Sequence, residues 1–295
     1  MSIRELKTLL AVAERGSISA AAESMYLSIP AVSAHIQKLE EDFQVRLLDR
    51  ARRPARLTEA GAALLPRARE LVAQYESLHQ AVSTPRDLAG SLAIGAIPTA
   101  LTGVIPQVLA ALRRAHPRLH VRLEHGLSPS LAERLRHREL DAAIISEPRA
   151  LPESLVWTPF QEEPVVVIGL MAAKEKTDAE LLRKHPYIRF NRHFWVSKTI
   201  EEFLVRKGIM VREVMKLDSL EAIGQMVKHG LGVSIIPLSD PSFLRFHKIR
   251  ALPLGKPGLR RRIGLAVPRD GGKALLVSSL MELLTRYGQR QAKAF

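Results

Sequence analysis

The fold of the N-terminal part is decided by residues 27–43, which read Leu27-Ser-Ile-Pro-Ala-Val-Ser-Ala-His-Ile-Gln-Lys-Leu-Glu-Glu-Asp-Phe43. Ser28 can cap a helix, and Pro30 then stands in the first turn, where a backbone N–H is not needed. Apolar residues recur at intervals of four and three along one face of this helix. They are Val32, Ile36, Leu39 and Phe43. The segment therefore predicts a helix that packs with this face and exposes the small and polar residues at its N-terminal end.

Two shorter helices are expected before it. An apolar face at Ile3, Leu6, Leu9, Leu10 and Ala13 predicts the first helix, and Gly16 ends it. Ser17 or Ser19 can cap an Ala-rich second helix that runs to Met25. Two short helices joined by a tight turn, the later one exposing small and polar residues, are typical of a DNA-reading helix-turn-helix.

A basic segment and a long helix follow. Arg50–Arg56 holds four Arg in seven residues and predicts a wing that grips phosphate. Thr58 then caps a helix whose apolar residues are spaced as a heptad seam. They are Leu64, Ala68, Leu71, Tyr75, Leu78 and Val82. The seam can join two copies of the chain or pack against its own chain, and we favour dimerisation. The break at Thr84–Gly90 is the expected domain boundary.

From Ser91 onward, short apolar runs alternate with amphipathic segments, which predicts parallel α/β units. Helices are expected at 101–115, 130–138, 198–207, 220–229 and 273–287, and strands at 92–97, 120–124, 142–145, 165–170, 187–190, 214–217, 233–236 and 262–267. Two α/β lobes fit this count better than one. We expect the last strand and helix to belong to the first lobe.

Composition and charge limit the classes of function that the chain can have. The chain has 295 residues, no Cys and a net charge of +14. Residues 1–89 hold 12 Lys and Arg against 11 Asp and Glu, so +13 of this charge lies in 90–295, and 174–262 alone carries 19 basic against 9 acidic residues. An organic anion bound in the C-terminal part would account for this excess, and so would a solvated basic surface. Charges near the N-terminus argue against a secretory signal, and the longest apolar run, Val165–Ala173, is too short to span a membrane. We therefore expect a soluble cytoplasmic protein.

The sequence resembles the LysR-type transcriptional regulators. The resemblance is dense over the first 61 residues, in Ala20-Ala-Ala-Glu23, Leu27–Ile36, Leu39–Arg50 and Leu57-Thr-Glu-Ala-Gly61. It continues more loosely in Glu139–Ile144 and Gly230–Pro237. It implies an α/β chain with an all-α winged helix-turn-helix domain (1–57), a linker dimerisation helix and hinge (58–89), and a two-lobed effector domain like periplasmic binding proteins (90–295). The lobes would comprise about 90–162 with 263–295, and about 163–262.

The resemblance also implies which residues read DNA. They are Ser28, Ile29, Pro30, Ala31, Ser33, Ala34, Gln37 and Lys38, and the basic segment adds Arg52 and Arg53 as phosphate contacts. Ile29 stands where the family commonly has Gln, and Ala34 where it commonly has a long basic residue, which reduces hydrogen bonding to base edges. Contacts with a thymine methyl, with phosphate and with DNA shape then carry more of the recognition. We interpret His35 as a packed surface residue and not as a base contact.

Effector residues are expected where strands end and helices begin. Thr99 and Ala100 follow the first strand, and Ser128 precedes a helix in the same way, although each hydroxyl can also serve only as a helix cap. Arg192 or His193 can pair with a carboxylate, and Trp195 can supply an apolar wall.

The sequence lacks the motifs expected of an enzyme. Gly230-Leu-Gly232 lacks the third glycine of a dinucleotide loop, and the ten His are scattered, so we predict no catalytic residue, cofactor or metal. A solute-binding protein with a helical extension would leave the first 89 residues without a role, and an enzyme acting on nucleic acid is a further alternative. We predict a regulator that binds an interrupted palindrome in double-stranded DNA and an organic acid. It would form a homodimer through the linker helix and a homotetramer, with RNA polymerase as a further candidate partner.

Overall fold

The computed structural model describes residues 1–50, 54–81, 88–190 and 195–292. It divides into two compact units, Met1–Leu88 with His137–Glu139, and Ala89–Arg136 with Leu140–Phe295. Each unit has its own hydrophobic core, and each is described separately below.

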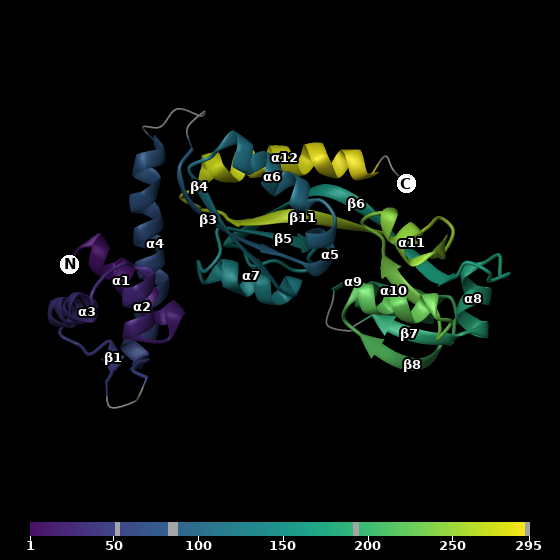
Figure 1. Cartoon of the computed structure of the whole chain (residues 1–295), viewed down its shortest axis with the longest axis horizontal. Helices are drawn as coiled ribbons and strands as arrows, with labels where there is room; N and C mark the ends of the chain where they lie inside the picture. Colours follow the sequence, from purple (N-terminus) through teal and green to yellow (C-terminus); the bar gives the residue numbers. More distant parts are fainter. Residues whose placement is uncertain (51–53, 82–87, 191–194, 293–295) are drawn as a thin grey trace. The chain divides into compact units, whose positions relative to one another are not determined.

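The first unit is helical, with one short hairpin (Figure 1). Its elements are α1 (Ile3–Arg15), α2 (Ile18–Ser24), α3 (Ile29–Phe43), β1 (Leu48–Asp49), β2 (Arg56–Leu57) and α4 (Glu59–Ala81). The predicted caps are confirmed: Ser17 accepts from the Ala20 amide, Ser28 from the Ala31 amide, and Gly16 ends α1 in the left-handed region. The antiparallel strands β1 and β2 form the base of the predicted wing.

The core of this unit lies where α1, α2, α3 and α4 meet. The predicted apolar face of α3 is buried at Val32, Ile36 and Leu39. The prediction was wrong for Phe43, which is 42% exposed. Phe43 is the last residue of α3 and is followed by Gln44 in the left-handed C-cap conformation, so its side chain lies beyond the core.

The residues of the predicted heptad seam differ in burial along helix α4. Ala68 is buried and Leu64 packs against the core of the same unit, as the own-chain interpretation predicts. Leu71 is 43% exposed, and Tyr75 is exposed to a similar degree. The side chain of Leu78 and all of Val82 lie outside the described residues. Part of the seam therefore completes this unit, and Leu71 and Tyr75 are exposed.

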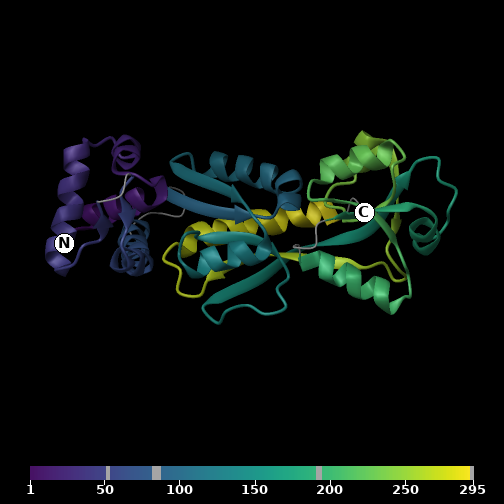
Figure 2. The ribbon, with the colours of Figure 1, turned by 90° about the horizontal axis from the view of Figure 1, so that it is seen from below.

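The second unit has two lobes that share long strands (Figure 2). The first lobe contains β3 (Gly90–Ala96), α5 (Pro98–Thr102), α6 (Ile105–Ala115), β4 (Leu119–His125), α7 (Ser128–Arg136), β5 (Ala142–Ser146), the start of β6 (Leu155–Leu170), β11 (Arg260–Pro268) and α12 (Ala274–Ala292). The sheet order is β10-β6-β11-β5-β3-β4, with β9 also paired to β6. Helices α6 and α12 cover one face of the first lobe's sheet and α7 the other (Figure 1).

The second lobe follows β6 along the chain. It contains α8 (Asp178–Lys184), β7 (Pro186–Phe190), α9 (Trp195–Arg206), β8 (Arg212–Leu217), α10 (Leu220–Lys228), β9 (Ser234–Pro237), α11 (Ser242–His247) and β10 (Ile249–Pro253). Strands β7 and β8 pair in parallel as a small separate sheet, while β9 and β10 pair with the far half of β6. One strand, β6, therefore enters both lobes.

Three expectations need correction. The parallel arrangement holds for β3 with β4 and β5 and for β7 with β8, but β6 pairs antiparallel with β9, β10 and β11. The helix expected at 101–115 is two helices, because Gly103 ends α5 and Pro106 stands in the first turn of α6. The strand expected at 165–170 begins ten residues earlier, at Leu155, and α8, α11 and β10 were not anticipated.

The helices of the described residues were all compared with the length and hydropathy of membrane spans. None of them combines the length and apolar character that crossing a bilayer requires.

Candidate nucleic-acid interface and small-molecule cavity

The N-terminal end of α3 presents the predicted DNA-reading residues at the surface. Six of the eight residues on the helix are exposed, namely Ser28, Ile29, Pro30, Ala34, Gln37 and Lys38, and two are half-buried, namely Ala31 and Ser33. The Ser28 hydroxyl serves as the helix cap, accepting from the Ala31 amide at 3.3 Å. An exposed helix end with an apolar opposite face is the arrangement that a groove-reading helix needs.

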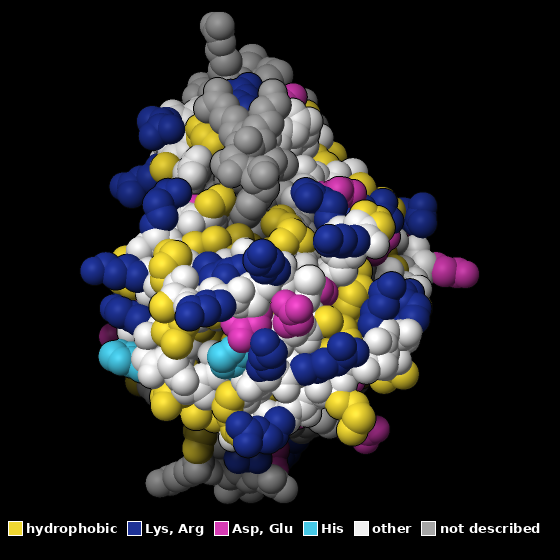
Figure 3. Space-filling view, turned by 90° about the vertical axis from the view of Figure 1, so that its right-hand side faces the viewer, with side chains coloured by type: hydrophobic (Ala, Val, Ile, Leu, Met, Phe, Trp, Pro, Cys, Tyr) yellow, Lys and Arg dark blue, Asp and Glu magenta, His cyan; other side chains and the backbone are white. Residues whose placement is uncertain are grey.

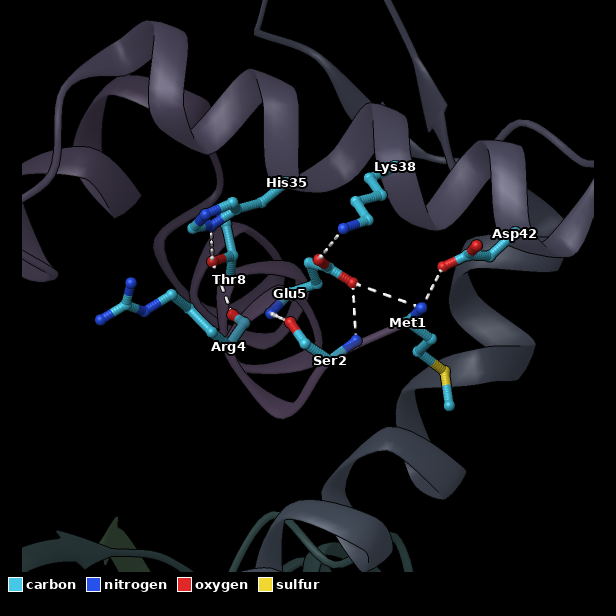
Figure 4. Close-up of polar contacts among 8 residues, drawn as sticks. All are labelled: Met1, Ser2, Arg4, Glu5, Thr8, His35, Lys38 and Asp42. Carbon is cyan, nitrogen blue, oxygen red and sulfur yellow. Dashed lines mark hydrogen bonds and ion pairs between the residues drawn. The ribbon is translucent and has the colours of Figure 1, made fainter.

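Helix α3 is fixed to α1 by polar contacts behind this surface (Figure 4). Thr8 Oγ1 lies 2.9 Å from His35 Nδ1, and the same hydroxyl donates to the Arg4 carbonyl. The Thr8 hydroxyl must then accept from His35, which therefore carries its proton on Nδ1. This agrees with the interpretation of His35 as a packed residue.

A second contact involves the buried carboxylate of Glu5. It accepts from the Ser2 amide at 2.7 Å, and Ser2 Oγ accepts from the Glu5 amide, which completes a capping box at the start of α1. The same carboxylate lies 3.5 Å from Lys38 Nζ on α3, and the Met1 ammonium lies 2.5 Å from Asp42 (Figure 4). Burial raises the pKa of Glu5, but hydrogen bonds from Ser2 and the charge of Lys38 outweigh it and leave the pKa below its ordinary value.

Two predicted base contacts have partners within the protein. The Lys38 ammonium pairs with Glu5, and the Gln37 amide donates to Glu41 Oε1 at 3.1 Å. Arg52 and Arg53 lie outside the described residues. Tyr26 was not predicted as a surface residue of interest. It is 97% exposed and has a left-handed backbone conformation in the turn before α3. A large aromatic residue between two predicted helices was the available signal.

In the second unit, a cavity of about 550 Å³ lies between the end of β5, strand β11 and the first turns of α9. Its wall is formed by Ser146, Glu147, Pro148, Arg149 and Ala150, by Trp195, Val196, Lys198 and Thr199, and by Arg260, Arg261 and Arg262. Residues of both lobes therefore meet around one space.

The four arginines of this wall are already paired. Their carboxylates are Glu202 for Arg149 at 2.5 Å, Glu162 for Arg260 at 3.2 Å, Glu163 for Arg261 at 2.6 Å, and Glu147 for Arg262. Lys198 has no carboxylate within ion-pair distance in the part of the chain that the structure describes, although its charge helps to lower the pKa of Glu202. The hydrogen bond from Arg149 is the main cause of that lowering. Among the described residues, five cations and four carboxylates leave one net positive charge at the cavity.

The structure places the predicted effector residues at different depths. Trp195 lines the cavity. Thr99, Ala100 and Ser128 are buried and do not line it. Arg192 and His193 lie outside the described residues.

Two of the buried hydroxyls contact residues of the cavity wall. Thr99 Oγ1 accepts from Arg261 at 2.5 Å, and Ser128 Oγ accepts from the Ser146 amide at 3.3 Å. Neither acts as the cap expected from sequence: Ile97 holds the cap position of α5 without a side-chain bond, and the Ser128 hydroxyl bonds to β5.

Sequence reasoning missed the cations of the cavity. The run Arg260-Arg261-Arg262 stood at the end of the basic region already noted, and Arg149 and Lys198 carried no motif. Their pairing depends on strand register, since Arg261 stands opposite Glu163 across β11 and β6.

On the face of the second lobe that Figure 3 shows, the basic residues do not form one patch. Lys and Arg side chains are spread over this end of the chain, with hydrophobic and acidic side chains between them (Figure 3). This distribution is typical of a solvated basic surface. Within the described ranges, no cluster of three or more His, Asp or Glu could hold a metal ion.

Comparison with known proteins agrees with this division. Residues 3–62 match the bacterial regulatory helix-turn-helix protein, lysR family, and residues 85–289 match the LysR substrate binding domain. A relative named "Probable RuBisCO transcriptional regulator" from Cyanophora paradoxa is 33% identical over 81% of this chain and 76% of its own length.

Two solved structures have a similar fold. A single-residue variant of full-length OxyR from Pseudomonas aeruginosa is 25% identical with a TM-score of 0.76, covering 96% of this chain and 94% of its own. The effector binding domain of QuiR in complex with shikimate is 19% identical with a TM-score of 0.60, covering 69% of this chain and 99% of its own. The helix-turn-helix match, the substrate-domain match and the regulator relative all identify the same group. The chain belongs to the LysR family of DNA-binding transcriptional regulators, with an N-terminal helix-turn-helix domain followed by an effector-binding domain.

Proposed function

We propose that this regulator is controlled by a small organic monoanion, a carboxylate with an apolar body, bound in the cavity beside Trp195 and Lys198. The observation that carries the proposal is the charge balance of the cavity wall, which leaves the Lys198 ammonium without a carboxylate partner among the described residues. Among the described wall residues, a second negative charge on the ligand would have to break an existing arginine pair.

Each part of the wall would have a distinct task. Lys198 would make a charge-assisted hydrogen bond to the carboxylate, and Trp195 would cover its apolar body. The hydroxyls of Ser146 and Thr199 are available for orientation. The structural neighbour QuiR is in complex with shikimate, which is itself a carboxylate, and this supports the class of ligand.

The residues predicted from sequence enter this proposal indirectly. Thr99 would position Arg261, and Ser128 would position Ser146, through the hydrogen bonds described above. Ala100 would fill the space behind them. Arg192 and His193 lie outside the described residues, and a contact of either with the carboxylate stays a prediction.

The test is calorimetric titration of the full chain with the carboxylate that gives the largest thermal shift in a panel of metabolite acids. Lys198→Ala should weaken binding by about 10- to 100-fold, because a charge-assisted hydrogen bond contributes about 1.5–3 kcal/mol. Lys207→Ala removes an exposed Lys just beyond α9 and should leave affinity unchanged. Equal affinity of the two variants would reject the site.

For DNA, we propose that α3 enters the major groove with its N-terminal end. Ile29, Pro30 and Ala31 would contact thymine methyl groups, and Ser33, Ala34, Gln37 and Lys38 would face base edges and phosphates along the next turn. Ser28 would act through its cap. Two copies would read an interrupted palindrome, because two-fold protein symmetry imposes two-fold site symmetry.

This division of roles is tested by gel shift with specific and competitor DNA. Arg52→Ala and Arg53→Ala should weaken binding to every sequence and flatten its salt dependence, since phosphate contacts release counterions whatever the base. Pro30→Ala and Ser33→Ala should change sequence preference instead. Equal loss on specific and competitor DNA in the latter pair would contradict the assignment.

The assembly we propose is a homodimer through α4 and a homotetramer of two such dimers. The exposure of Leu71 and Tyr75 supports a partner on this helix. RNA polymerase as a partner, a cytoplasmic location and the absence of catalytic activity stay predictions.

A further inference from the structure

A second cavity, of about 320 Å³, lies in the effector-binding unit and shares no wall residue with the first. It is bounded by the end of β9 with the loop after it, by the start of α10 and by α11, and Thr102 of α5 contributes from the first lobe. Most of its wall is apolar, with aromatic side chains on one side, Phe243 and Phe246.

Two buried polar side chains in this wall lack hydrogen-bond partners among the residues that the structure describes. The Ser239 hydroxyl has none, although Ser239 is only 6% exposed, and Nδ1 of the fully buried His247 also has none. Leaving a buried polar atom without a hydrogen bond costs about 1–3 kcal/mol, so a bound molecule that supplies this hydrogen bond would be favoured.

The contacts of His247 determine what that partner must offer. Its Nε2 lies 3.1 Å from Glu221 Oε2, and a carboxylate can only accept, so the ring proton sits on Nε2. In the neutral ring Nδ1 is then an acceptor, and it requires a donor from outside.

The ring is held in place on several sides. Phe243 and Phe246 pack against it with ring centroids 4.5 and 5.0 Å away. A Cβ added to Gly224 on α10 would lie 2.7 Å from Nε2, so α10 leaves room for the imidazole only because this position is Gly. His247 is therefore a fixed acceptor with an aromatic surround.

The charge at this cavity is opposite to that of the first. Glu221 and Asp240 line it, and Lys and Arg are absent from its described wall. Asp240 is engaged within the chain, because it accepts from the amide and hydroxyl of Ser242 at the start of α11. The Glu221 carboxylate accepts from His247 through Oε2 and from Gln225 through Oε1, at 3.3 Å. Its side chain is more than half exposed, so it can also face a cationic group in the cavity.

We infer that this cavity is a second small-molecule site, specific for a neutral or cationic aromatic compound that carries hydroxyl or ammonium donors. Ser239 and His247 Nδ1 take one donor, Phe243 and Phe246 enclose the ring, and Glu221 accepts from a cationic group. A carboxylate is disfavoured because it would meet two acidic side chains and no cation.

The probe that matches this chemistry is tyramine, which carries a phenol hydroxyl and an ammonium on one ring. Its counterpart 3-(4-hydroxyphenyl)propionate keeps the phenol ring but carries a carboxylate in place of the ammonium. Calorimetric titration of the full chain should show tyramine binding at least tenfold tighter than the propionate.

Variants then locate the binding. Ser239→Ala should weaken tyramine binding about fivefold, as expected for one neutral hydrogen bond. Glu221→Gln should weaken tyramine but not phenol, because only the ammonium depends on the carboxylate. Lys198→Ala, in the first cavity, should change neither, so this test stands apart from the test of the carboxylate site.

Three results would overturn the inference. The first is that tyramine does not bind at millimolar concentration. The second is that tyramine and the propionate bind with equal affinity. The third is that tyramine affinity is unchanged in both Ser239→Ala and Glu221→Gln.

Discussion

Replacement of Glu5 should loosen α3 without touching the surface that α3 presents. The Glu5 carboxylate completes the capping box with Ser2 and pairs with Lys38, so it joins α1 to the DNA-reading helix. Glu5→Ala removes both, at about 1 kcal/mol for the capping contact and about 0.5–1 kcal/mol for the ion pair, the latter because the Lys38 side chain is 62% exposed. We expect a total loss of about 1.5–2 kcal/mol.

Glu5→Gln separates the two contributions. An amide oxygen can still accept from the Ser2 amide, so this variant should lose only the ionic part, about 0.5–1 kcal/mol. In a double-mutant cycle with Lys38→Met, the coupling energy should have that same size. The matched control is Glu23→Gln, an exposed carboxylate on α2, which should show no coupling to Lys38.

The direction of the pH dependence also follows from the contacts of Glu5. Its folded-state pKa lies below the ordinary value of 4.5, so the carboxylate stabilises the fold fully above that value. This stabilisation is lost as the pH falls through the lowered pKa, and Glu5→Gln should remove that part of the acid sensitivity.

Amide hydrogen exchange of α1 and α3 in the full chain is the suitable measurement, because it reports opening of this unit separately from the rest. A coupling energy below about 0.2 kcal/mol, or the same coupling with Glu23→Gln, would refute the assignment of Glu5 as the link between α1 and α3.

Two further predictions concern assembly and the second lobe. Leu71→Lys with Leu78→Lys should yield smaller particles by light scattering, because like charges would be buried against a partner helix; an unchanged mass with an intact fold would show that this half of the seam also faces its own chain. Burial raises the pKa of Tyr187 to about 12 against the opposing charge of Arg189, whose guanidinium lies 5.3 Å from the ring centroid. The neutral phenol therefore contributes its full stabilisation below pH 10. As the pH rises toward 12, the free energy of unfolding falls by about 2–3 kcal/mol. Tyr187→Phe should keep the second lobe folded further into that range by near-UV circular dichroism, and identical alkaline transitions would contradict the cause given for the shift.

The helices of the first unit could be predicted because their signals are local. A cap, a stop and a repeating apolar face lie within one segment, and Ser17, Ser28 and Gly16 act in the structure as these rules require. Phe43 fits the same repeat but lies past the core, since periodicity describes the face of a helix and not how far the neighbouring helices extend.

Strand β6 shows what a local pattern cannot supply. Residues 155–164 include two Pro and two adjacent Glu, which do not alternate as strand residues commonly do. They form a strand because β11, about a hundred residues later in the chain, pairs with them. The buried Glu163 is tolerated only because Arg261 stands opposite and pairs with it.

The same long-range pairing explains why the cations of the cavity wall escaped prediction while strands β5 and β11 did not. Thr99 and Ser128 were singled out because each follows a strand, and the structure does place both near the cavity. Their hydroxyls are taken by Arg261 and the Ser146 amide, contacts that depend on strand register between distant segments. Sequence position therefore placed these two residues within one layer of side chains of the cavity, and strand register determined which side chains line it. If this reasoning holds, Thr99→Val should weaken carboxylate binding only through Arg261, and Arg261→Lys combined with Thr99→Val should cost no more than Arg261→Lys alone in calorimetric titration. Additive losses would mean that Thr99 contacts the ligand itself.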